Sequence, residues 1–446
     1  MTISNPTGIE AIKLNKKDED LLASDTQNLG HVPAKDGNPK KEKKIQKKIN
    51  ELHSVLEKVI SDQNHQYELN MVSLEELRKD RIEPNHNRDF NITLHLLGPG
   101  VDSFKLPMNP LFSNGVQVVA SQTNCNESPH YINTTHPNSY FRDPTQGPRA
   151  QLASPLAAYY RWHVLAKKPA ACDFLVDFKK EENTIIHDGK ELRFNDIFFE
   201  KNGYVYPKTR FEEPAERFLK KHADKIKINF EQVTTHLPGK QGRVPYFQAL
   251  TAAFSLSPVY SGKSEEQIQR SQTAAQLFLK TQFEIVARAT VYEAQKNPGT
   301  PMPLVLCPVG YGVFKNEFNT VASAIDDAIK IIRESGCDNV RVYLSCFSEK
   351  ELNAFQQYFQ SESLNKDKLA ISRVTELQSH GNHHASGLGQ RSRVVTGSLD
   401  PSRLSPPDDQ VASSSSLCCG LFNWRRGTSK NSIKANTENT PLVMPK

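Results

Sequence analysis

The stretch that decides the fold is Leu304-Val305-Leu306-Cys307-Pro308-Val309-Gly310-Tyr311-Gly312-Val313-Phe314, and a helical pattern over residues 319–335 follows it. The apolar run predicts a buried strand, and two glycines one residue apart let the backbone turn tightly beside a ligand. The following helix directs its free N–H groups and the positive end of its dipole at this loop. A phosphate-bearing ligand is therefore the candidate, and an ordinary tight turn is the alternative.

This loop matches neither of two common nucleotide motifs. The sequence contains no Gly-x-x-x-x-Gly-Lys-Ser/Thr pattern, and Lys315 stands near the place where a dinucleotide fingerprint needs its third glycine. Other residues must therefore supply the specificity of the site.

Length and charge limit the classes of protein. The 446 residues, 37% of them hydrophobic, can bury a sizeable core. Residues 35–48 carry a net charge of +5 and residues 373–446 one of +4, which leaves about −3 of the total +6 for the rest. A slightly acidic body argues against a nucleic-acid groove, which needs clustered Lys and Arg.

Cysteine usage and the lack of long apolar segments indicate the cellular compartment in which the protein works. The seven cysteines are an odd number and form no Cys-x-x-Cys pair, which indicates reduced thiols in a cytosol. No apolar run of 18 residues and no secretory signal pattern occur, so we expect a cytoplasmic protein or one exported without a cleaved signal.

The sequence predicts four segments. Residues 1–39 are polar and aperiodic and are expected to be disordered. Residues 40–87 form a helical extension, in which apolar residues at helical spacing over 40–63 predict an amphipathic helix that either packs on the body or binds a partner. Residues 88–372 form the main domain, and the Ser/Pro-rich, basic residues 373–446 are an expected disordered tail.

Within the main domain, strand and helix patterns alternate. A helix is expected at residues 264–297 and a hairpin turn at Asp188-Gly189, whereas Asp326 and Asp327 are expected to face solvent. Strands are expected at residues 90–96, 116–120, 174–178, 226–234, 304–306 and 340–344. This alternation predicts an α/β fold, a three-layer mixed sheet with helices on both faces, with ligands at the carboxyl ends of the strands.

An unusual polar block follows the expected strand at 116–120. It reads Ser121-Gln122-Thr123-Asn124-Cys125-Asn126-Glu127 and places amides and a carboxylate at a strand's carboxyl end. Buried polar groups must be hydrogen-bonded or face a ligand. A second cluster, Asp143-Pro144-Thr145-Gln146-Gly147-Pro148, precedes one expected helix that carries Leu152, Leu156, Tyr159 and Tyr160. Asp143 is therefore either a functional carboxylate or part of a helix cap.

Together these blocks resemble a known family. Residues 118–127, 143–148, 160–161, 256–261 and 310–316 look like a divergent macrodomain, in the branch related to poly(ADP-ribose) glycohydrolase that includes a Legionella effector. The resemblance spans residues 88–350. It implies a macrodomain-like fold, an ADP-ribose site and hydrolysis of an ADP-ribosyl bond by an ADP-ribosylhydrolase.

The same resemblance implies site residues. The diphosphate loop would comprise Gly310, Tyr311, Gly312, Val313 and Phe314, with Phe314 packing on a ribose and Asn316 completing the binding set. Gln122, Asn124 and Glu127 would face the distal ribose. Cleavage at the ribose C1″ needs a carboxylate that protonates the leaving group or orients water. Glu127 is the first candidate and Asp143 the second; no cofactor and no metal are expected.

Two alternatives to the enzyme remain open. The Gly-Gly-Gly run of the glycohydrolases is absent and Asn126-Glu127 replaces their paired acids, which also fits a non-catalytic reader of ADP-ribosylated proteins. The other alternative is an adaptor with a vestigial pocket. The effector resemblance suggests a host target such as ADP-ribosylated ubiquitin, although no residue indicates ubiquitin.

The tail holds two further features. Cys418 and Cys419, beside apolar residues and two arginines, suit acylation and peripheral contact with an anionic membrane. His380, His383 and His384 have a spacing that can catch a metal, but no acidic or Cys ligand lies beside them.

Overall fold

The structure is a computed structural model, which describes residues 17–18, 22, 39–61, 69–79, 91–127, 136–143, 145–201, 203–208, 211–236, 243–256, 264–312 and 314–374. The tail cysteines and histidines, Val313 and residues 257–261 lie outside the described residues. No helix in these ranges is long and apolar enough to span a membrane.

An eight-stranded mixed sheet organises the described chain. Its strand order is β1 (Met71–Ser73), β8 (Lys227–His236), β9 (Arg243–Thr251), β3 (Val116–Ala120), β10 (Met302–Leu306), β11 (Val340–Ser345), β2 (Ile92–Leu97) and β12 (Leu369–Val374). Only β8 of these eight strands runs antiparallel to its two neighbours. The carboxyl ends of β3, β10 and β11 therefore meet at one edge.

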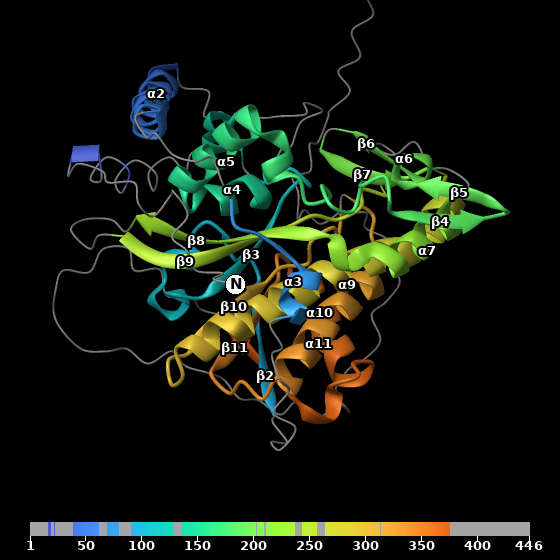
Figure 1. Cartoon of the computed structure of the whole chain (residues 1–446). Helices are drawn as coiled ribbons and strands as arrows, with labels where there is room; N and C mark the ends of the chain where they lie inside the picture. Colours follow the sequence, from blue (N-terminus) through green and yellow to red (C-terminus); the bar gives the residue numbers. More distant parts are fainter. Residues whose placement is uncertain are drawn as a thin grey trace, which may run out of the picture.

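Helices cover both faces of this sheet (Figure 1). One face carries α4 (Gln146–Leu152) and α5 (Pro155–Lys167), and α2 (Pro39–Ser61) packs on α5. The other carries α3 (Leu74–Lys79), α9 (Glu265–Lys296), α10 (Phe318–Glu334) and α11 (Glu349–Ser361). The expected α/β three-layer arrangement is confirmed.

A smaller unit lies between α5 and β8 in the chain. It contains the hairpins β4 (Thr184–His187) with β5 (Lys190–Arg193) and β6 (Phe198–Lys201) with β7 (Tyr204–Pro207), plus α6 (Phe194–Ile197) and α7 (Glu212–His222). Asp188 and Gly189 both have positive φ, which confirms the predicted hairpin turn. The second hairpin reaches the carboxyl end of β3, where Thr123 donates to the Gly203 carbonyl at 2.9 Å.

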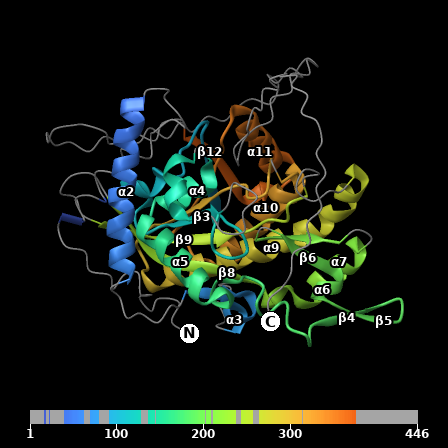
Figure 2. The same ribbon diagram turned by 90° about the horizontal axis from the view of Figure 1, so that it is seen from above.

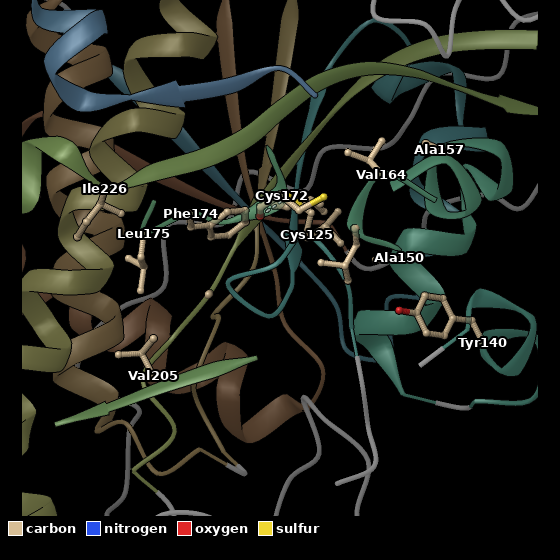
Figure 3. Packing of buried hydrophobic residues seen from close by; sticks show 14 of the residues in the cluster. Cys125, Tyr140, Ala150, Ala157, Val164, Cys172, Phe174, Leu175, Val205 and Ile226 are labelled. Carbon is tan, nitrogen blue, oxygen red and sulfur yellow. Dashed lines mark hydrogen bonds between the residues drawn. The ribbon is translucent and has the colours of Figure 1, made fainter. Parts of the chain in front are cut away.

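The helix α2 confirms the amphipathic pattern of the N-terminal segment. Its buried residues are Ile45, Ile49, Leu52, Leu56 and Ile60, at three- and four-residue spacing. Seen from above, α2 runs along the outer side of α5 (Figure 2). Its apolar face joins the core cluster that includes α5 and the loop after β3. Figure 3 shows part of this cluster, with Cys125 and Cys172 next to each other; the Cys125 thiol lies 3.1 Å from the Cys172 carbonyl oxygen.

Three local predictions were wrong. Residues 174–178 form turns. The side chains of Phe174 and Leu175 lie in the core beneath the smaller unit, and the Phe174 N–H donates to the Thr123 carbonyl of the loop after β3. The helical pattern around Leu152 divides into α4 and α5 at Ser154, before Pro155. Asp326 is 2% exposed, since its carboxylate accepts from the Ser363 hydroxyl at 2.6 Å and the Leu364 N–H at 3.0 Å. Asp327, by contrast, is partly exposed and pairs with Lys280.

Candidate functional site

The glycine loop after β10 has the backbone shape that its sequence predicts. Gly310 and Gly312 have φ of +83° and +89°, in the left-handed region that side chains disfavour. Tyr311 N–H donates to the Pro308 carbonyl at 3.1 Å and Lys315 N–H to the Gly312 carbonyl at 3.0 Å. Within the described chain, the N–H group of Gly310 has no acceptor, whereas the backbone bridge between Tyr311 and Asn316 pairs the Gly312 N–H with the Asn316 carbonyl. Unpaired N–H groups at such turns are a common way to bind anions.

Asn316 holds this loop in place. Its Nδ2 donates to the Phe254 carbonyl at 2.9 Å and to the Gly310 carbonyl at 3.0 Å. A Cβ on Gly310 would lie 2.5 Å from the Ala253 Cβ and 2.7 Å from Asn316 Nδ2. Gly310 is thus required by local packing, and Asn316, which the resemblance assigns to the ligand, has its amide nitrogen engaged with the backbone, while its Oδ1 has no partner among the described residues.

Two aromatic residues of the loop have protein neighbours. The Phe314 ring meets the Tyr204 ring edge-on at 4.9 Å, and the Phe314 carbonyl accepts from Leu256 N–H at 2.8 Å. The Tyr311 ring lies 6.0 Å from that of Phe318 at the start of α10. The loop is therefore joined to the β6–β7 hairpin through Tyr204.

A pocket of about 630 Å³, including solvent at its mouth, opens beside the loop. It lies among the carboxyl ends of β3, β10 and β11, the loop after β2, and α4. Its walls are mostly apolar, with Ser103, Gln117, Gln146 and Ser345 as polar groups. A concave, largely apolar space with a few placed polar groups is typical of a small-molecule site.

Glu127 lies directly behind one wall of this pocket. Gly147, a lining residue, is so close that a Cβ there would meet the Glu127 Cγ at 3.1 Å and Cδ at 3.2 Å. The Tyr204 hydroxyl donates to Glu127 Oε1 at 3.1 Å. The Tyr140 hydroxyl accepts from Glu127 N–H at 2.8 Å and so fixes the backbone at this point.

Burial gives Glu127 an unusual protonation state. Desolvation raises its pKa from 4.5 to about 8, the bond from Tyr204 opposes this rise, and the charge of Asp143 adds to it. The carboxyl is therefore largely protonated at neutral pH. Such a group can donate a proton to a leaving group.

Asp143 makes local contacts at the start of α4. Its Oδ1 accepts from Thr145 N–H at 2.8 Å and from the Thr145 hydroxyl at 2.5 Å. This is the short side-chain-to-backbone turn that orders a helix start. Asp143 therefore orders α4 and also acts on Glu127 through its charge.

Gln122 and Asn124 lie beneath the β6–β7 hairpin. Gly203, with φ of +71°, is so near that a Cβ there would lie 2.8 Å from the Gln122 side chain and 2.9 Å from Asn124 Nδ2. Gln122 is fully buried, and neither residue is among those that line the pocket. Their position couples the end of β3 to the hairpin that carries Tyr204.

The structure adds residues that the sequence patterns did not single out. Gln117 and Gly147 line the pocket, and Tyr204 bonds to Glu127. A lone amide in the apolar run Val116–Ala120 was a visible signal for Gln117. Tyr204 lies on a hairpin 77 residues after Glu127 in the sequence, and no sequence pattern indicated its role.

Two thiols in the pocket wall do not supply a nucleophile. Burial raises the pKa of Cys307 to about 12 and that of Cys346 still further. The thiolate is the nucleophilic form, so these cysteines act as small apolar lining residues.

A histidine cluster anchors α2 away from the pocket. Glu57 Oε1 lies 3.2 Å from His136 Nε2, Glu57 Oε2 lies 2.9 Å from His163 Nε2, and His53, Glu57 and His136 together bring three potential metal ligands within 4.8 Å. Asn138 N–H donates to His136 Nδ1 at 3.1 Å, so a neutral His136 carries its proton on Nε2 and donates it to Glu57. His53 Nδ1, in contrast, lies 3.8 Å from Glu57 Oε1 and has no hydrogen-bond partner among the described residues.

Comparison with known proteins gives matches only among solved structures. No protein-family model and no curated protein matches the chain. The chain is similar to poly(ADP-ribose) glycohydrolase from Deinococcus radiodurans in complex with ADP-ribose, at 13% identity and a TM-score of 0.34, over 65% of this chain and 94% of that one. It is also similar to a mutant Oceanobacillus iheyensis macrodomain, at 13% identity and a TM-score of 0.24, over 62% and 94%. Similarity at this level does not identify a function.

Proposed function

We propose that the chain binds ADP-ribose in this pocket and hydrolyses an ADP-ribosyl bond on a modified protein. The observation that carries the proposal is that one pocket wall contains Gly310 of the anion-binding loop and Gly147, against which the Glu127 carboxyl packs. A ligand with a diphosphate and a reactive sugar needs such a combination. The resemblance to a bacterial effector suggests that the modified protein belongs to a host, so a host ADP-ribosylated protein is the expected partner.

The diphosphate is assigned to the glycine loop. The Gly310 N–H, which has no acceptor in the described chain, would donate to a phosphate oxygen, and the N-terminus of α10 adds a favourable dipole. No side chain at either glycine obstructs this approach. The apolar part of the pocket would hold the nucleoside.

Glu127 supplies the proton in the reaction. The bond between C1″ and the leaving oxygen or nitrogen breaks, the leaving group takes the proton of Glu127, and water adds to C1″. The Glu127 carboxylate then recovers a proton from that water. Tyr204, which donates to Glu127 Oε1 at 3.1 Å, stabilises the carboxylate between these steps.

A reader without catalysis is the second candidate. It is favoured by the position of Asp143, whose Oδ1 is engaged by Thr145 and which is not among the residues that line the pocket. Glycoside hydrolysis usually uses two carboxylates. Membrane contact through Cys418 and Cys419 and a cytoplasmic location stay predictions.

The test uses the full chain with an ADP-ribosylated protein and with free ADP-ribose. Release of ADP-ribose that falls at least about 10²-fold in Glu127→Gln supports the enzyme. Binding in calorimetry without release supports the reader, and absence of both supports an adaptor. Gly312→Glu is the control for the site, because a carboxylate about 4 Å from a phosphate costs roughly 4 kcal/mol at an effective dielectric of 20 and should abolish binding.

A further inference from the structure

The histidine cluster at α2 contains two buried polar atoms without partners. His53 Nδ1 is buried and has no hydrogen-bond partner among the described residues, and the same holds for the hydroxyl of Tyr159, a fully buried side chain. The Tyr159 ring lies 5.8 Å from the His53 ring and 5.4 Å from the His136 ring, so all three side chains belong to one cluster. Buried polar atoms without partners are costly and indicate a water molecule or an ion that binds beside them.

The ligand atoms of this cluster have nearly the spacing of a metal site. His53 and Glu57 stand four residues apart on α2, so their side chains project from the same face of the helix. Glu57 Oε1 lies 3.2 Å from His136 Nε2 and 3.8 Å from His53 Nδ1, and one ligand atom from each of the three residues lies within 4.8 Å of the others. Bonds of about 2.0–2.1 Å to a tetrahedral Zn²⁺ separate neighbouring ligand atoms by roughly 3.4 Å. Small side-chain movements therefore bring all three atoms onto one ion.

The second oxygen of Glu57 is held by a further residue. Glu57 Oε2 lies 2.9 Å from Nε2 of His163, which stands on α5. Contacts of this kind orient carboxylate ligands at metal sites. The rings of Tyr159 and Trp162 pack on His136 and give the cluster an apolar wall. Burial raises the pKa of Tyr159 and the charge of Glu57 raises it further, so the hydroxyl stays protonated and can donate to a water on the ion.

We propose that His53, Glu57 and His136 bind one divalent transition-metal ion, with Zn²⁺ as the fitting ion and water as its fourth ligand. Imidazole nitrogens suit such ions, and two histidines with one carboxylate are a ligand set that zinc uses. The ion joins α2 to the segment before η3 (Pro137–Arg142) and so holds the N-terminal helix on the body. The proposal is independent of ADP-ribose, because these residues do not line the pocket.

Coordination moves the ring proton of His136. Asn138 N–H donates to His136 Nδ1 at 3.1 Å, so the neutral ring carries its proton on Nε2. A metal at Nε2 shifts this proton to Nδ1, and the bond from Asn138 must open. One neutral hydrogen bond is small beside the binding free energy of a metal with three protein ligands. Binding therefore costs this bond and gives partners to the two atoms that lack them.

Calorimetric titration of the metal-free full chain with Zn²⁺ tests the proposal. The parent should bind one ion at the cluster with a Kd in the micromolar range or tighter, Mg²⁺ should not compete, and the melting temperature should rise with the Zn²⁺ concentration. His53→Gln should weaken this binding at least about 10²-fold and, because it breaks no hydrogen bond of Nδ1, should melt near the parent without zinc. His163→Gln alters only the contact to Glu57 and should weaken binding about 10–100-fold.

Two controls locate the ion. His187→Gln removes a histidine outside the cluster that also lies beside a carboxylate, 3.4 Å from Asp188, and should bind Zn²⁺ as the parent does. The tail histidines at residues 380–384 are the alternative ligands, and their joint replacement by Gln should leave the binding intact. Binding that persists in His53→Gln, or that is lost with the tail histidines, would overturn the proposal. Absence of zinc binding would also overturn it and would leave water as the partner of the two buried atoms.

Discussion

The buried carboxyl of Glu127 predicts an unusual dependence of stability on pH. Desolvation raises its pKa from 4.5 to about 8, against the hydrogen bond from Tyr204. Because the folded-state pKa lies above that of the unfolded chain, the contribution to stability is fully present below about pH 4.5. It is lost as the pH rises through about 8.

The size of this effect follows from the shift. Each pKa unit corresponds to about 1.36 kcal/mol, so the shift from 4.5 to about 8 corresponds to roughly 5 kcal/mol between acid and alkaline limits. Over this window, the parent should lose up to about 1.4 kcal/mol per pH unit through Glu127 alone. Glu127→Gln keeps the shape and removes this ionisation.

Chemical denaturation at pH 5 and pH 8 measures the effect. From pH 5 to pH 8 the parent should lose several kcal/mol more free energy of unfolding than Glu127→Gln does. Glu213→Gln is the control, because this carboxyl is exposed on α7. Its free energy of unfolding should depend on pH as that of the parent does. Identical pH slopes for the parent and Glu127→Gln would refute the account of Glu127 as a buried acid.

Three further predictions concern the groups around the site and α2. Tyr204→Phe removes the donor to Glu127 Oε1, so the pKa of Glu127 should rise. The loss of hydrolysis at alkaline pH should then occur at a higher pH than in the parent. An unchanged pH profile of hydrolysis would show that Tyr204 does not influence the acid. Gly147→Ala places a Cβ 3.1 Å from the Glu127 Cγ, so turnover should fall roughly tenfold while calorimetric binding of ADP-ribose changes little. Glu57→Ala leaves two histidines without their acceptor and should lower the free energy of unfolding by about 1–3 kcal/mol, whereas Glu51→Ala on the exposed face of α2 should not.

Much of the fold could be predicted because its signals are local. The strand β3 and the helix α10 were expected within one residue of their observed bounds, since apolar runs and helical periodicity mark them directly. The residue Gly336, with φ of +66°, follows the C-cap Ser335 and supplies the left-handed conformation that commonly ends a helix. In the same way, the glycine loop has the positive φ values that its sequence suggested.

The wrong predictions arose where tertiary packing overrode a local pattern. The residues at 174–178 are a short apolar run interrupted by Asp177, but they form turns that place Phe174, Leu175 and Phe178 in the core. Asp326 stands next to the partly exposed Asp327 on the same helix. Its burial depends on contacts with Ser363 and Asn365, and a sequence pattern does not show that these distant residues are close to it in space. The strands β1 and β12 were missed for a related reason, because their pairing partners lie far away in the chain.

The candidate site was only partly predictable. Glu127 was found because a carboxylate after an apolar strand is conspicuous, whereas its raised pKa depends on burial by distant segments such as the β6–β7 hairpin. Gln122 and Asn124 were expected at the ligand, and the structure places both beneath that hairpin. Their assignment to ligand binding stays a prediction.

A crystal structure of the full chain with ADP-ribose tests the central claim most directly. The account predicts the diphosphate against the glycine loop at Gly310 and the distal ribose on the Glu127 side of the pocket. ADP-ribose bound elsewhere on the molecule, or a pocket that stays empty at saturating ligand, would contradict it.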